Sequence, residues 1–146
     1  MSEELPQIIE TLAKRARSAS LVLASASTKQ KNEALQHIAE GLESNRKLLT
    51  IENQKDLDAA KENGLSEAMV DRLRLTHERI DGMAKGLREL IELPDPVGVL
   101  IEEKERPNGL KIRKVRVPIG VIGIIYESRP NVTIDCAGLC IKSGNA

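Results

Sequence analysis

The chain has 146 residues, of which 40% are hydrophobic, so it is long enough for one packed domain or for part of a larger one. Its 22 lysines and arginines balance its 22 aspartates and glutamates, and this zero net charge disfavours nucleic acid and anionic lipid as partners. Phenylalanine and tryptophan are absent and Tyr126 is the single tyrosine, which excludes a surface that stacks several bases.

Helical periodicity predicts a helical layer over residues 1–93. Apolar residues recur at steps of three and four over residues 8–23, which indicates one amphipathic helix. A second helix follows, with its apolar face over residues 34–42 and a capping box formed by Ser27 and Gln30.

The second half of this layer is more charged. Residues 45–63 predict one broken helix or two, which Asn63-Gly64 end because glycine accepts the left-handed conformation. Ser66 and Thr76 are each placed to cap a further helix. The helix after Thr76 is predicted to face inward with Ile80, Met83, Ala84, Leu87 and Ile91. Pro94 and Pro96 then end the helical region.

Strand signals follow and predict a β-hairpin in residues 94–117. Residues 97–101 and 110–117 have strand composition, and Arg106-Pro107-Asn108-Gly109 between them is typical of a turn. The alternation of apolar residues in the second strand is imperfect, which predicts a bulge or a change of environment near Arg113-Lys114. The four basic residues of this strand fit either a solvated face or a stripe that attracts phosphate.

Residues 118–146 predict one strand followed by one helix. The apolar run Val121–Tyr126 is typical of a strand buried on both faces of a parallel sheet, and residues 132–142 have a helical pattern that Gly144 ends. This α/β unit is incomplete, because a parallel strand needs a parallel neighbour. Ligands bind at the carboxyl ends of such strands, so residues 127–131 are the expected binding loop.

Other features predict a cytoplasmic protein without a membrane span. The longest apolar stretches are far shorter than the roughly 18 residues that a span requires. The start of the chain, Met1-Ser2-Glu3-Glu4, is acidic where a secretory signal is basic. Cys136 and Cys140 provide no disulfide framework, which favours thiols in a reducing compartment.

The sequence VPIGVIGIIYESRPNVT, residues 117–133, closely resembles the segment that opens the cofactor domain of γ-glutamyl phosphate reductases. Shorter stretches resemble the same family in the same order, and these are residues 63–69, 71–73, 95–98 and 142–146. The resemblance therefore covers essentially the whole chain. It predicts that the chain is the N-terminal portion of a longer protein.

This family belongs to the aldehyde dehydrogenase superfamily, so the resemblance implies an aldehyde-dehydrogenase-like α/β fold. Residues 1–93 are expected to be the helical part of the cofactor-binding domain. Residues 94–117 are expected to form the hairpin and to act as an oligomerisation arm. Residues 118–146 are expected to be the first strand, loop and helix of a Rossmann-like nucleotide-binding domain.

The resemblance also implies an activity, which is the NADPH-dependent reduction of γ-glutamyl phosphate to glutamate γ-semialdehyde, with release of phosphate, in proline biosynthesis. In the family a cysteine thiolate takes the acyl group, and hydride from the cofactor reduces the thioester. That cysteine lies in a later domain, so this chain alone is expected to be inactive. Cys136 and Cys140 are expected to be buried structural thiols. No metal site is expected, because His37 and His77 lie far from them in the sequence.

The resemblance places the ligand contacts in and beside the binding loop. Asn131 is assigned to donate from its amide to the oxyanion, and Arg129 to clamp the acyl phosphate or the α-carboxylate of the substrate. Two alternatives remain open: Asn131 caps the helix, and Arg129 forms a salt bridge with Glu127 or Asp135. The residues assigned to the cofactor are Tyr126, Glu127 and Ser128.

Further implications concern partners. The family suggests a homo-oligomer at full length and glutamate 5-kinase as a protein partner. Two competing hypotheses are a stand-alone, non-catalytic interaction module of aldehyde-dehydrogenase-like ancestry and a superfamily enzyme that acts on another acyl substrate. The second is disfavoured because the loop of residues 127–131 resembles the acyl-phosphate branch.

Overall fold

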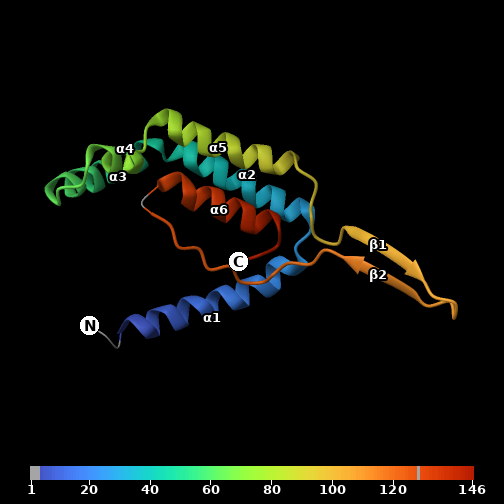
Figure 1. The fold of residues 1–146 in the computed structure, drawn as a ribbon. Helices are drawn as coiled ribbons and strands as arrows, with labels where there is room; N and C mark the ends of the chain where they lie inside the picture. Colours follow the sequence, from blue (N-terminus) through green and yellow to red (C-terminus); the bar gives the residue numbers. More distant parts are fainter. Residues whose placement is uncertain (1–3, 128) are drawn as a thin grey trace.

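The structure is a computed structural model, and it describes residues 4–127 and 129–146. Its described part contains helices and one antiparallel sheet of two strands (Figure 1). The elements are α1 (Glu4–Ser25), α2 (Thr28–Ser44), α3 (Arg46–Glu62), α4 (Glu67–Leu73), α5 (His77–Glu92), β1 (Leu100–Glu105), β2 (Lys111–Val115) and α6 (Pro130–Lys142).

The main core lies between α2, α5 and α6, which run side by side in one layer (Figure 1). Its side chains are the apolar residues that recur at steps of three and four on α2 and α5, so the predicted helix faces are confirmed. Ile134 and Ile141 of α6 pack against this core. The buried residues are Leu35, Ala39, Leu42, Ile80, Met83, Ala84 and Leu87.

The predicted helix caps are confirmed. At the start of α2, the Ser27 hydroxyl accepts from the Gln30 N–H, and the Gln30 side chain accepts from the Ser27 N–H at 2.9 Å. At the starts of α4 and α5, the Ser66 hydroxyl accepts from the Met69 N–H and the Thr76 hydroxyl accepts from the Arg79 N–H. These hydrogen bonds satisfy N–H groups that a helix start leaves without a partner.

Gly138 allows α6 to approach α5 closely. A Cβ atom at this position would lie 2.7 Å from a methyl carbon of Leu87 and 2.9 Å from one of Leu90. Both distances are far below ordinary van der Waals contact. The glycine therefore sets how closely these two helices pack.

A buried ion pair joins the start of α2 to the turn between α5 and β1. The Lys31 side chain is 1% exposed and its Nζ lies 2.5 Å from Asp95 Oδ2. The Thr28 hydroxyl donates to the same oxygen at 2.8 Å, and the Val97 N–H donates to Oδ1 at 2.9 Å. Burial alone would raise the pKa of Asp95, but the hydrogen bonds from Lys31, Val97 and Thr28 prevail and lower it.

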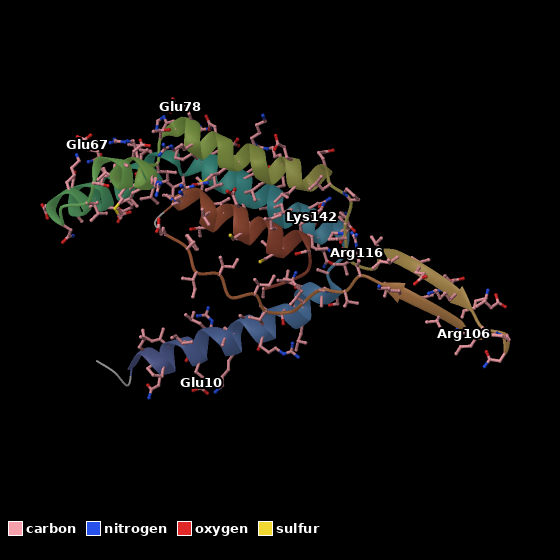
Figure 2. The ribbon with its side chains drawn as sticks, viewed as in Figure 1. Glu10, Glu67, Glu78, Arg106, Arg116 and Lys142 are labelled. Carbon is pink, nitrogen blue, oxygen red and sulfur yellow. The ribbon has the colours of Figure 1, made fainter. Side chains whose placement is uncertain are left out.

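Lys142 fixes the end of α6 beside the same turn (Figure 2). Its ammonium group donates to Asn32 Oδ1 at 2.8 Å and to the Ile91 carbonyl at 3.0 Å. Burial lowers the pKa of Lys142, because it disfavours the charged form. The ends of three helices and the turn at Asp95 are thus tied together by polar contacts.

The prediction for residues 45–63 is wrong in one respect, because α3 is a single unbroken helix. Its span contains no glycine or proline, so its exposed charges did not require an interruption. Asn53 of α3 is buried, donates to the Leu73 carbonyl at 2.9 Å and accepts from the Leu75 N–H at 2.7 Å. These bonds hold the link between α4 and α5.

The predicted hairpin is confirmed, and it projects from the helical layer with Arg106 at its tip and Arg116 near its base (Figures 1 and 2). β1 begins three residues later than the predicted strand of residues 97–101, β2 is shorter than the predicted strand of residues 110–117, and all residues of both strands are exposed. The register irregularity falls between Leu100 and Glu102 on β1, not on β2 near Arg113-Lys114. The predicted position of the bulge is therefore wrong, because the extra residue lies on β1.

Residues 121–126 do not form a strand in the described structure, and most of their side chains are exposed. The prediction of a strand buried on both faces is therefore wrong here. The physical reason is that a parallel strand requires hydrogen-bonded neighbours along its length. Among the described residues, the segment has such a neighbour only at Ala146. The Ala146 N–H donates to the Gly120 carbonyl at 2.9 Å, and the Ile122 N–H donates to the Ala146 carbonyl at 2.7 Å. This is the hydrogen-bond pattern of a parallel pair centred on Val121.

Candidate functional site

The predicted binding loop leads into α6, and the start of that helix positions two of the predicted residues. Pro130 occupies the first turn, where its missing N–H costs nothing. Arg129 is the N-cap residue and has no capping hydrogen bond from its side chain. The alternative that Asn131 caps the helix is therefore wrong, because Asn131 lies inside the first turn.

The side chain of Asn131 points along the helix surface. Its Nδ2 donates to Asp135 Oδ2 at 3.4 Å, which is long for a hydrogen bond. Both side chains are exposed. So long a bond leaves the amide able to donate to another acceptor.

Arg129 and Asn131 share a pocket of about 390 Å³ between α6 and the α4–α5 region. From the α6 side the pocket is lined by Arg129, Pro130, Asn131 and Asp135. From the other side it is lined by Asp71, Arg72, Arg74, Leu75, Arg79, Gly82 and Met83. The structure thus brings the predicted substrate and oxyanion residues together.

Arg79 braces the α4–α5 wall of this pocket. Its Nη1 donates to the carbonyls of Asp71 and Arg74, at 2.5 and 2.7 Å, and its Nη2 donates to Asp71 Oδ2 at 3.1 Å. Arg74 Nε lies 4.0 Å from the same carboxylate. The turn that carries these side chains is therefore held by charged hydrogen bonds.

The salt bridge proposed as the alternative role of Arg129 is not formed. Glu127 pairs with Arg72 instead, at 3.7 Å, and the Arg129 guanidinium enters no ion pair within residues 4–127 and 129–146. The arginines of the α4–α5 wall were not predicted to belong to the site. Three of them fall within eight residues of sequence, Arg72 to Arg79, and this density was the available signal.

Two of the residues assigned to the cofactor, Tyr126 and Glu127, do not line this pocket. The Tyr126 hydroxyl contacts the Thr133 hydroxyl at 2.5 Å, and both residues line a separate pocket of about 330 Å³ with mainly apolar neighbours. Glu127 lies in a small cleft of about 120 Å³ that it shares with Arg72 and Arg129. Ser128 is outside the described residues.

Cys136 and Cys140 are half-buried free thiols that line the pocket of Tyr126. Burial raises the pKa of the Cys140 thiol, and the neighbouring Cys136 raises it further. A thiol with a raised pKa is protonated at neutral pH and is a poor nucleophile. The raised pKa argues against Cys140 as a nucleophile, and both thiols are half-buried where the sequence predicted buried ones.

Two features are absent from the described residues. They contain no group of three or more histidine, cysteine or acidic residues that could hold a metal ion. They also contain no helix long and apolar enough to cross a membrane. In a scan against models of protein families, the chain matches none.

Two relatives of high sequence identity carry the same name. A γ-glutamyl phosphate reductase of Opitutus terrae is 56% identical over 146 residues, which is 100% of this chain and 34% of that protein. A protein of the same name from Carboxydothermus hydrogenoformans is 58% identical over 135 residues, which is 92% of this chain and 32% of that protein.

Solved structures agree with the sequences. The γ-glutamyl phosphate reductase of Thermotoga maritima matches 92% of this chain and 32% of its own, with a TM-score of 0.89 and 50% identity. The enzyme of the same name from Saccharomyces cerevisiae matches 93% and 35%, with a TM-score of 0.88 and 36% identity. By sequence and by fold the chain belongs to the γ-glutamyl phosphate reductase family, and it spans about a third of the length of these relatives.

Proposed function

We propose that this chain is part of an enzyme that reduces γ-glutamyl phosphate to glutamate γ-semialdehyde, with NADPH as the reductant and release of phosphate, in proline biosynthesis. The observation that carries the proposal is 56% identity over all 146 residues to a protein named for this activity. The pocket between α6 and the α4–α5 region adds support, because its arginines suit an anionic substrate.

Two residues of this pocket have distinct chemical roles in the proposal. Arg129 binds an anionic group of the substrate, since its guanidinium has no ion-pair partner in the described part of the chain. Asn131 donates from its amide to the oxygen of the thioester, where negative charge develops in the transition state. The Asn131 amide is available for this role, because its 3.4 Å hydrogen bond to Asp135 costs little to break.

The nucleophile is not assigned to this chain. Acyl transfer of this kind needs a thiolate, and the raised pKa of Cys140 argues against that residue. The family resemblance places the nucleophilic cysteine in a later domain, so we assign it to a residue beyond the segment that this sequence covers. On this proposal the 146-residue chain alone does not reduce γ-glutamyl phosphate.

The surroundings of Tyr126 fit one end of a nicotinamide dinucleotide. Its pocket is lined mainly by apolar side chains, which suits a flat ring, and the Glu127 carboxylate can accept from ribose hydroxyls. NADPH supplies the hydride when bound. Tyr126, Glu127 and Ser128 are the residues that we assign to hold it.

The assembly of the intact enzyme is part of the same proposal. The hairpin projects from the helical layer, and all of its strand residues are exposed, which suits an arm that contacts another copy of the chain (Figure 1). We propose a homo-oligomer, with glutamate 5-kinase as the partner that supplies the unstable acyl phosphate. The cytoplasm, where Cys136 and Cys140 stay reduced, is the proposed location.

The test uses the full-length enzyme and two substitutions. Asn131→Ala is expected to lower kcat about a hundredfold or more, because it removes an interaction made only in the transition state. Arg129→Ala is expected to act through KM, because the substrate carries its charge from the start. Unchanged kcat in Asn131→Ala would withdraw the oxyanion role. A full-length wild-type enzyme without activity on γ-glutamyl phosphate would refute the function itself.

A further inference from the structure

The pocket beside Arg129 carries charges of both signs. Four arginines and two aspartates line it, so its wall contains anionic as well as cationic groups. A carboxylate in the wall would repel a phosphate dianion. Charges of both signs instead match a ligand that also carries both, such as the α-ammonium and α-carboxylate groups of an amino acid.

Most of these charges already have partners. Asp71 is paired with Arg79, and Arg72 with Glu127. The charged residues that line the pocket from α6 are not paired with each other or with the opposite wall in the described part of the chain. Arg129 has no ion pair in the described part of the chain, and there Asp135 accepts from the Asn131 amide at 3.4 Å. One cation and one anion are therefore available on the same side of the pocket.

We propose that Arg129 binds the α-carboxylate of the glutamyl substrate and that Asp135 binds its α-ammonium group. This inference rests on the proposed function, and it makes Asp135 the residue that selects amino-acid substrates. A guanidinium offers a planar pair of donors to a carboxylate, and a carboxylate accepts strongly from an ammonium group. The α-carboxylate, not the acyl phosphate, is then the ligand of Arg129.

The helical spacing supports this assignment. Asn131 and Asp135 are four residues apart on α6, and Cβ atoms at that spacing lie about 5–6 Å apart. A glutamyl chain spans a similar distance between its ammonium nitrogen and its γ-carbonyl. With the ammonium group on Asp135, the carbonyl oxygen reaches the Asn131 amide, which the ammonium group has displaced from Asp135.

The opposite wall suits the rest of the substrate. Leu75 and Met83 give it an apolar part, against which the methylene groups of a glutamyl chain can pack. Arg79 holds this wall in place through the carbonyls of Asp71 and Arg74. Arg79 is therefore a positioning residue, and we assign it no contact with the substrate.

The test measures substrate discrimination by the full-length enzyme in the oxidative direction. In that direction the aldehyde and hydrogen phosphate give the acyl phosphate, NADP⁺ takes the hydride of the aldehyde carbon to become NADPH, and one proton is released to water. Glutamate γ-semialdehyde is compared with 5-oxopentanoate, which lacks the amino group. Asp135→Asn is expected to lower kcat/KM about tenfold or more for the first, as for loss of a hydrogen bond to a charged group, and to leave the second unchanged.

A second variant tests the carboxylate. Arg129→Gln is expected to lower kcat/KM for both of these substrates but not for butanal, which has no carboxylate. Asp135→Glu keeps the charge and should retain most of the discrimination. Asp56→Asn, on an exposed position of α3 outside the pocket, is the matched control and should change nothing.

The outcomes separate the possibilities. Equal losses on both substrates in Asp135→Asn would overturn the ammonium assignment, and a raised KM for phosphate with butanal in Arg129→Gln would show a phosphoryl site instead. If the wild-type enzyme oxidises neither aldehyde, the proposed function fails. If the wild type is active and the variants do not discriminate, only the present inference fails.

Discussion

The layer formed by α2, α5 and α6 encloses a buried apolar core, whereas α1 and the hairpin leave most of their large apolar side chains exposed. Leu35, Ile80 and Leu87 are almost fully buried between helices of the layer. On α1, Ile8, Ile9 and Leu12 have the same helical spacing but stay more than half exposed. Periodicity therefore predicts which face of a helix is apolar, but it does not predict what covers that face.

The candidate site belongs to the buried layer and its edge. Arg129 and Asp135 lie at the start of α6, and Arg79 lies in the first turn of α5. α5 and α6 are anchored at their other ends by Lys142, which contacts the carbonyl of Ile91. We expect the site to keep its geometry as long as this layer is folded.

Asp95→Ala is expected to lower the unfolding free energy of the layer of α2, α5 and α6 the most. The substitution leaves the buried Lys31 ammonium without its partner, which costs about 3–5 kcal/mol of unfolding free energy in such pairs. Urea unfolding of the 146-residue chain, followed by circular dichroism, measures the loss. The double variant with Lys31→Met should recover much of the stability, because it removes the uncompensated charge. A loss below about 1 kcal/mol in the single variant would mean that water reaches Lys31.

The same carboxylate predicts a pH dependence. The folded pKa of Asp95 is lowered from its ordinary value of 3.8, so the unfolded chain binds a proton more readily. The stability that the ion pair contributes is present above about pH 3.8 and is lost as the pH falls through the lower folded value. Unfolding measured across this acid range should show a smaller decline in Asp95→Asn than in the wild type, and equal declines would contradict the account.

Within the core, Ile80→Ala is expected to cost about 2–5 kcal/mol, because it removes a fully buried side chain and leaves a cavity. The measurement is the midpoint of urea unfolding, with the slope of the transition as a check on two-state behaviour. A near-neutral result would show that the layer is loosely packed.

Gly138→Ala is expected to cost less, about 1–3 kcal/mol, through overpacking. The added Cβ would meet methyl groups of Leu87 and Leu90, which can shift only within a packed layer. Gly41→Ala is the matched control, because nothing lies within 4 Å of a Cβ atom there. Alanine in place of glycine within a helix should then stabilise slightly at Gly41 and destabilise at Gly138.

The smallest effect is expected for Ile9→Ala in α1. Its side chain is 58% exposed, so the change should stay within about 0.5 kcal/mol in this chain. Thermal unfolding of the variant beside Ile80→Ala gives the comparison directly. A loss as large as that of Ile80→Ala would mean that α1 is packed in solution.

The sequence predicted the parts of the fold that depend on local signals. The faces of α2 and α5, the caps at Ser27, Ser66 and Thr76 and the hairpin turn all follow from residue type and spacing. The prediction of a strand at residues 121–126 was wrong, because strand formation depends on neighbouring strands that a local sequence pattern does not reveal.

Only the part of the site that lies on one local segment could be predicted from the sequence. Arg129 and Asn131 lie on one short segment, and the structure does bring them into one pocket. The opposite wall comes from residues more than forty positions earlier, and only tertiary packing brings Arg79 close to them. The paired Lys31 and Asp95 were equally hidden, since a buried lysine has no sequence signature.

Native-state hydrogen exchange of the 146-residue chain is the most direct test of the difference between its two regions. The account predicts that amides of α2, α5 and α6 exchange slowest, with free energies of opening near that of global unfolding. Amides in the first half of α1 and in the hairpin should exchange far faster. Equal protection of α1 and α5 would contradict the account, because it would show that the exposed apolar face of α1 is covered in solution.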